Sequence, residues 1–303
     1  MAALFDAYIM VDWSAASKPS LGANSIWIGI LAKDARLKLQ YRGVNIDTRL
    51  KARAFIEDMV AKLTKRGDKV LIGFDFALGF PAGTAAALGL DTSAQAPWAA
   101  MYAHLATKMK EKPDNSNARY AIAAGMNYAI SKGPFPFWGA PTRDVVSTLA
   151  ATRPEFEGAA LAEHRHCENY LKENKIGQPK SVWQLAYAGS VGSQTLTGIP
   201  HVHALRQAWP TSRVWPFELG TEPLTRDALE GISVVMAEIY PALVKAKPEK
   251  GEVADEAQVR QIARHYADLD EKGTLAASFS TAKSLSPEQN RDVAEEEGWI
   301  LGV

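Results

Sequence analysis

Two apolar segments of this sequence each end in an aspartate. Asp12 closes the run Tyr8-Ile9-Met10-Val11, and Asp75 closes the run KVLIGF that begins at residue 69. Uninterrupted apolar and β-forming residues of this length predict buried strands, so each strand would deliver one carboxylate to an edge of the sheet. A third such strand, ISVVMAEIYP after residue 231, carries Glu238 on the same face as Val234 and Met236.

A fourth acid is predicted to face the core from the start of a helix. Val259, Ile262, Ala263 and Tyr266 follow Asp255 at plus 4, 7, 8 and 11. This spacing forms one helical stripe, which places Asp255 on the buried side of the first turn. The alternative is that Asp255 only complements the helix dipole, an effect of about 0.3 to 1 kcal/mol.

Acids at the carboxyl ends of neighbouring strands are expected to converge. Two carboxylates about 4 Å apart repel by roughly 4 kcal/mol at an effective dielectric constant near 20, so they must share a proton or bind a cation. An all-oxygen site favours magnesium or manganese over zinc. Such a site suits phosphoryl chemistry. The simpler alternative for Asp12 is that its side chain only caps the loop after the strand.

The elements that would position these acids follow an α/β order. We expect a three-stranded meander over residues 8–12, 25–31 and 36–42, a crossover helix over 48–66, and the strand that ends at Asp75. A largely helical insertion follows over residues 80–211, with helices near 94–110, 115–131 and 155–174. Strands at 212–218 and after residue 231, a helix from 255 and a weaker helix over 286–297 complete the chain. We therefore predict one α/β domain over 1–303, built on a mixed sheet of five or six strands.

Composition excludes several classes of protein. The 303 residues carry 34 basic and 34 acidic side chains, and this zero net charge argues against a surface for strong nonspecific nucleic-acid binding. No long apolar run or basic leader is present, so we expect neither a membrane span nor a signal peptide. The single cysteine, Cys167, excludes an internal disulfide and fits a reducing compartment. We expect a cytoplasmic protein.

Four motifs carry a resemblance to a known family. The segments VDWSAAS, IGFDFALGFP, AEIYPAL and ADEAQVR resemble a bacterial family of predicted nucleases with the ribonuclease H-like fold. The resemblance implies a mixed sheet flanked by helices and a carboxylate site of Asp12, Asp75, Glu238 and Asp255. It also implies that this site binds magnesium or manganese and cleaves phosphodiesters of nucleic acid. The rival to Glu238 is Glu218, which also ends an apolar run.

The turn after the first strand supports a second hypothesis. Ser14, Ser17 and Lys18 follow Asp12 in an arrangement similar to the phosphate-binding hairpin of the actin and sugar-kinase branch of the same fold. That similarity implies a protein that binds a nucleotide or transfers a phosphoryl group to a small molecule. Ser14 and Lys18 are the candidate phosphate contacts, and the alternative is a polar hairpin tip. A third hypothesis is an inactive binding module on the same fold.

The remaining polar residues give weaker signals. Gln194, in a Gly- and Ser-rich stretch, and Arg206 are candidate substrate-binding residues. On a helix, His164 and His166 would point about 200° apart, so we interpret the segment EHRHCE as a solvated helix face. His201 and His203 lack a third metal ligand and are interpreted as loop histidines.

Overall fold

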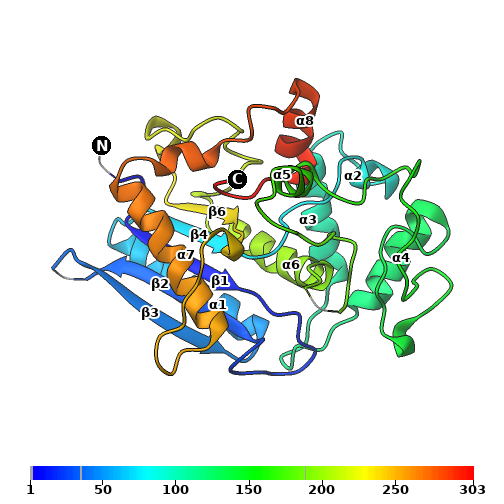
Figure 1. Ribbon diagram of the computed structural model, residues 1–303, viewed down its shortest axis with the longest axis horizontal. Helices are drawn as coiled ribbons and strands as arrows, with labels where there is room; N and C mark the ends of the chain where they lie inside the picture. The colour runs from blue at the N-terminus through cyan, green and yellow to red at the C-terminus, as the bar shows by residue number, and fades with distance from the viewer. Residues whose placement is uncertain (1–2, 35, 188) are drawn as a thin grey trace.

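The centre of the computed structural model, which describes residues 3–34, 36–187 and 189–303, is a six-stranded mixed sheet (Figure 1). The strand order is β3-β2-β1-β4-β6-β5. The strands are β1 Ala7–Asp12, β2 Ile26–Lys33, β3 Leu39–Ile46, β4 Val70–Phe74, β5 Ser212–Val214 and β6 Val234–Glu238. β1, β2 and β3 pair antiparallel, whereas β4, β6 and β5 continue the sheet parallel to β1. The prediction of an α/β fold with a mixed sheet is confirmed.

The third strand starts later than the sequence predicted. We expected it from Arg36, but β3 begins at Leu39. The reason is the turn before it: the Asp34 carboxylate accepts the backbone N–H groups of Arg36 and Lys38, and Leu37 takes a positive φ of 60°. This side-chain-stabilised turn draws residues 36–38 out of the strand.

Alternation along the strands separates two apolar layers. Ile9 and Val11 of β1 pack into one core cluster, and Tyr8 and Met10 pack into another on the opposite face. Successive residues of a strand point to opposite faces, so both faces of the sheet are buried. Asp12 has the parity of Tyr8 and Met10 and therefore belongs to the second face.

Long helices cover the two faces. Helix α1, Arg49–Lys65, begins at Thr48, whose side chain accepts the Lys51 N–H, and buries Ile56 and Val60 in the first layer. Helix α7, Ala254–Glu271, crosses β1 and β2 on the other face (Figure 1) and adds its own stripe to the second layer. The chain thus places the start of α7 near the end of β1.

The segment between β4 and β5 is a helical insertion beside the sheet (Figure 1). Its helices are α2 Thr84–Ala87, α3 Pro97–Lys108, α4 Arg119–Ser131, α5 His166–Glu173 and α6 Gly192–Ala208. Short elements elsewhere are η1 Thr142–Asp144, η2 Asp227–Leu229, η3 Pro241–Leu243, η4 Leu275–Phe279, α8 Pro287–Asp292 and the π-turn η5 Val293–Glu297. In the described part of the chain, no helix is long and apolar enough to cross a membrane.

Two interpretations of the insertion were wrong. The helix expected over 155–174 is only α5, which starts at His166 and leaves 155–165 irregular. The histidines at 201 and 203 are not in a loop, because the Gly- and Ser-rich stretch leads directly into α6 and both side chains lie on that helix. His201 is buried there, although the Gly, Ser and Pro content of the segment disfavours a helix.

Candidate functional site

Asp12 and Asp75 lie side by side at the carboxyl ends of β1 and β4. The parallel register pairs Val11 with Phe74, so the next residue on each strand is one of the two acids. Asp75 has the parity of Leu71, which packs on the α7 side, and this places both carboxylates on the same face of the sheet. The backbone N–H of Trp13 donates to Asp75 Oδ1 at 2.7 Å.

The two carboxyl groups form a coupled pair that retains a proton. Burial, followed by the charges of Asp75 and Asp255, raises the pKa of Asp12 to about 10. Burial also raises the pKa of Asp75 to about 7, against the opposing effect of the Trp13 N–H and of a hydrogen bond from Asp12. Near neutral pH, the pair therefore holds one proton between Asp12 and Asp75, as expected for two acids that cannot both ionise.

Asp255 approaches the pair from the first turn of α7. Its Oδ2 accepts the backbone N–H of Asn24 at 2.6 Å, which ties the helix start to the chain just before β2. Its charge contributes to the raised pKa of Asp12 and of Asp75. The structure therefore brings together three of the four acids that the sequence singled out.

No positive side chain of the described residues forms an ion pair with these acids. Among the ion pairs of residues 3–34, 36–187 and 189–303, none includes Asp12, Asp75 or Asp255, and no cation contributes to the pKa of Asp12. Within the same residues, no group of three or more His, Cys, Asp or Glu side chains is arranged closely enough to hold a metal ion. Asp12 and Asp75 thus form a pair with the Asp255 carboxylate nearby, and the three do not form a complete metal-binding site.

Asp12 and Asp255 line a pocket of about 480 Å³. The turn after β1 forms one wall with Ser14, Ala15 and Ala16, and the start of α6 forms another with Ser193 and Gln194. The remaining lining residues used below are Asp12, Asp255, Arg119, Tyr120 and Tyr187. The ring of Tyr187 is 61% exposed at this pocket, so it is available for contact with a ligand.

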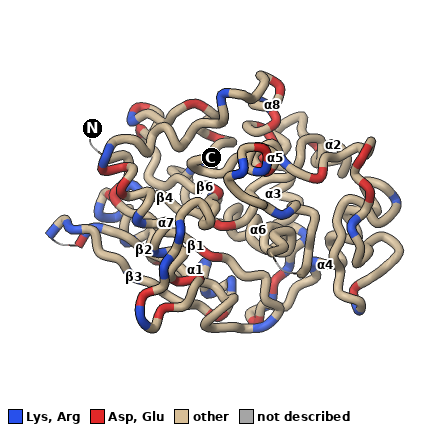
Figure 2. The backbone as a smooth tube through the Cα atoms, in the orientation of Figure 1, with Lys and Arg blue, Asp and Glu red and all other residues tan. Residues whose placement is uncertain are grey.

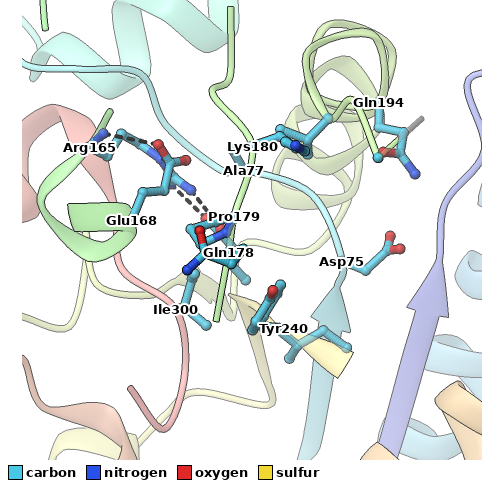
Figure 3. A pocket seen from close by; sticks show the side chains of 14 residues that line it. Asp75, Ala77, Arg165, Glu168, Gln178, Pro179, Lys180, Gln194, Tyr240 and Ile300 are labelled. Carbon is cyan, nitrogen blue, oxygen red and sulfur yellow. Dashed lines mark hydrogen bonds and ion pairs between the residues drawn. The ribbon is translucent and has the colours of Figure 1, made fainter. Parts of the chain in front are cut away.

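Asp75 lines a second pocket, of about 300 Å³ (Figure 3). Its polar lining includes Gln178, Lys180 and Tyr240, and the Asp75 side chain lies apart from the Arg165 and Glu168 group in Figure 3. Gln194 lines both pockets, and its Nε2 donates to the Trp13 carbonyl at 2.6 Å. Gln194 therefore lies between the two pockets and fixes the backbone of the residue that follows Asp12.

Glu238 does not join the other acids, contrary to the expectation for it. The register pairs it with Phe74, so it faces the side of the sheet opposite to Asp75. There it forms a two-pronged ion pair with Arg165, with Nη1–Oε2 and Nη2–Oε1 distances of 2.8 and 2.7 Å, and accepts the Leu78 N–H. Arg165 also donates to Glu168. Glu238 is thus committed to a buried structural pair.

The segment EHRHCE was expected to be a solvated helix face, and this interpretation was wrong. Arg165, Cys167 and Glu168 are each at most 2% exposed. His164 and His166 do point to different partners, Glu168 and Asp292 respectively. The segment therefore anchors α5 against β6 rather than presenting charges to water.

Three further predicted residues lie outside the acid pocket. The Lys18 side chain is exposed on the β1–β2 turn and does not line either pocket, whereas its carbonyl accepts from Asn115. Arg206 donates to Glu218 through Nε and Nη2, and the second carboxylate oxygen of Glu218 accepts the Val214 N–H. Arg206 and the rival acid Glu218 thus neutralise each other near the end of β5.

The β1–β2 turn is held from behind by a buried arginine. Arg49 Nη1 donates to the carbonyls of Ser14 and Ala16 at 2.7 and 2.9 Å, and Nε donates to Glu111 at 2.7 Å. Glu111 also contacts His201 Nε2 at 3.0 Å. This support fixes the turn that lines the pocket.

Arg119 is one of the pocket residues that the sequence did not single out. It opens α4 within the insertion, and nothing in its local sequence distinguishes it from a surface arginine of a helical segment.

Comparison of the chain with protein-family models, with curated proteins and with solved structures finds no match. Functional conclusions therefore depend on this geometry.

Proposed function

We propose that the protein is a metal-dependent phosphodiester hydrolase. The observation that carries the proposal is the buried Asp12–Asp75 pair, which has no cationic side chain in contact in the described residues and whose two members line two neighbouring pockets. Two buried carboxyl groups with raised pKa values and no cationic partner are typical of an active site, where they are kept at a cost in stability. Asp255, in the first turn of α7, adds a third carboxylate whose charge raises the pKa of Asp12 further.

The sheet topology supports assignment to the ribonuclease H-like fold. Three antiparallel strands, a crossover helix and parallel strands added beyond β1 follow the order implied by the family resemblance. The resemblance implies acids at the ends of the first and fourth strands and of the strand that carries Glu238, and at the start of the last long helix. Asp12, Asp75 and Asp255 match this pattern in position, whereas Glu238 is paired with Arg165.

The donor set fits a hard divalent cation. Asp12 and Asp75 would hold magnesium or manganese, and Asp255 would complete the protein ligands with an oxygen. A bound cation of this kind supplies an activated water and stabilises charge on the phosphate oxygens. The protein's own contribution is the orientation of the pair: the Trp13 N–H fixes Asp75, and Asp12 must release the shared proton for both oxygens to bind.

A compact, nucleotide-like ester fits the pocket better than a long duplex. Basic and acidic side chains are interspersed over the whole chain (Figure 2), which leaves little electrostatic attraction for an extended polyanion. Tyr120 and the exposed Tyr187 line the pocket and offer aromatic faces for a base. The second pocket provides room beyond Asp75 for the other half of a diester.

The test is hydrolysis of bis(p-nitrophenyl) phosphate and of short labelled DNA and RNA with manganese or magnesium. Asp12→Asn and Asp75→Asn should each lower the rate by at least about a hundredfold, because each removes a metal ligand. The control Asp58→Asn removes an exposed acid, 55% exposed, and should leave the rate unchanged. Equal rates for the parent and Asp12→Asn would refute the proposal.

A nucleotide-binding or phosphoryl-transfer protein is the second candidate. The observation in its favour is that Ser14, Ala15 and Ala16 line the same pocket as Asp12, with the turn held rigidly by Arg49. Thermal stabilisation separates the two functions. A rise in Tm that needs ATP with magnesium favours this candidate, and a rise with manganese alone favours the hydrolase.

A further inference from the structure

Arg119 is a buried arginine that has no acidic partner among the described residues. Only 7% of the residue is exposed, and none of the ion pairs in the described parts of the chain includes it. Its guanidinium donates to three neutral oxygens: Ser193 Oγ at 3.1 Å, Asn117 Oδ1 at 3.3 Å and Ser17 Oγ at 3.0 Å. Arginine is rarely buried to this degree without a counter-charge.

Glu111, the carboxylate linked to Arg119 through Asn117, already has other partners. Glu111 accepts from Asn117 and so is linked to Arg119 through one side chain, but it forms an ion pair with Arg49 and contacts His201. Burial lowers the pKa of His201, which is therefore neutral near pH 7. Glu111 therefore compensates the charge of Arg49, and no carboxylate of the described residues forms an ion pair with Arg119.

The surroundings of Arg119 prepare it to bind an anion. Its three hydrogen-bond partners come from the β1–β2 turn, the segment before α4 and the first turn of α6, and they hold the guanidinium in place. The group also lies over the ring of Tyr120, 4.7 Å from its centroid. A guanidinium has five N–H donors, so donors remain for a ligand. Arg119 lines the same pocket as Asp12, Asp255 and Ser14.

We propose that Arg119 is a phosphate-binding residue of this pocket and that the missing counter-charge is a phosphate oxyanion of the substrate. The substrate class is a phosphate ester whose charged group lies between Arg119 and the carboxylates. The positive end of the α6 dipole, at the wall formed by Ser193 and Gln194, adds to the attraction. This inference deepens the proposed function and rests on it for the reaction, but anion binding can be measured without metal or turnover.

The experiment is a thermal-shift titration with inorganic phosphate in EDTA, at an ionic strength held constant with sodium chloride. Phosphate should raise the Tm of the parent protein, because it binds only the folded state. Arg119→Gln should raise the phosphate concentration for a half-maximal shift by about tenfold or more, since it removes charge-assisted hydrogen bonds. The control Arg143→Gln removes an arginine whose side chain is 77% exposed and should match the parent.

Two outcomes would overturn the assignment: no phosphate-dependent shift in the parent, or the same shift in Arg119→Gln. If Arg119→Gln does not fold, Arg119→Lys keeps the charge but loses the planar fork, and it should still require more phosphate than the parent. Loss of hydrolysis in every assay together with Arg119-dependent phosphate binding would refute the hydrolase and leave the anion site in place.

Discussion

Replacing Asp12 by asparagine should stabilise the metal-free protein. In the folded state, burial and the neighbouring acids raise the pKa of Asp12 above its ordinary value, so the folded protein binds this proton more tightly than the unfolded chain. Stability from such a group is complete below the unfolded pKa, near 3.9, and is lost as the pH rises toward the folded value. Asparagine has the shape of protonated Asp12 and can donate to Asp75 at every pH.

The size of the effect follows from proton linkage. When the folded state binds one more proton than the unfolded chain, the free energy of unfolding falls by up to about 1.4 kcal/mol for each unit by which the pH rises. Over two units above pH 5 this amounts to about 3 kcal/mol, below the roughly 4 kcal/mol of repulsion between two carboxylates 4 Å apart. For a domain of this size, about 3 kcal/mol corresponds to a rise in Tm of roughly 5 °C.

The assay is thermal unfolding in EDTA between pH 5 and pH 9. The parent should lose stability as the pH rises, and Asp12→Asn should show a flatter profile and a higher Tm at pH 8. Asp58→Asn makes the same substitution at an exposed position on α1 paired with Lys62, and it should change stability by no more than about 0.5 kcal/mol. Manganese should stabilise the parent more at pH 8 than at pH 6, because binding displaces the shared proton, and should not stabilise Asp12→Asn.

The reasoning is refuted if Asp12→Asn melts below the parent at pH 8. It is also refuted if the two proteins have the same dependence of Tm on pH, because Asp12 would then have no perturbed proton to lose.

Other substitutions test the framework around the site. Arg165→Met should destabilise the protein by about 3 to 5 kcal/mol in urea unfolding, since it leaves two buried carboxylates without a cation. Gly198→Ala should cost about 1 to 3 kcal/mol, because its Cβ would lie 2.3 Å from the Phe76 ring, whereas Gly125→Ala on α4 meets nothing within 4 Å and should stabilise the helix by roughly 0.5 to 1 kcal/mol. Tyr187→Ala should raise KM for nucleotide esters severalfold at unchanged Tm, because the ring is exposed at the pocket; an unchanged KM would exclude base stacking there.

The positions of Asp12 and Asp75 were predictable because the signal is local. Each follows an apolar strand directly, and parallel strands joined by a crossover helix place such ends together. The inward side of α7 was predictable for the same reason, from spacing alone. Such a strand can be recognised from sequence because both of its faces are buried, which makes it a continuous apolar run.

Glu238 shows what strand patterning omits. It ends an apolar strand as the two aspartates do, but the register pairs it with Phe74 rather than with Asp75. An offset of one residue points a side chain to the opposite face. The register between β4 and β6 could not be predicted from the sequence, because about 160 residues separate the two strands.

The roles of Arg119 and Arg165 depend on contacts between distant segments. Arg165 meets β6 and the C-terminal π-turn, and Arg119 meets the β1–β2 turn and α6. Charged residues in helical segments are usually solvated, so the sequence favoured the surface for both. Only the tertiary arrangement shows that one is paired and the other is not.

The most direct measurement of the central claim is a crystal structure of the protein soaked in manganese, with anomalous scattering used to locate the ion. The account predicts a manganese peak within about 2.0 to 2.4 Å of carboxylate oxygens of both Asp12 and Asp75, with Asp255 as the next protein oxygen. A manganese ion bound elsewhere, with Asp12 and Asp75 still sharing their proton, would contradict it.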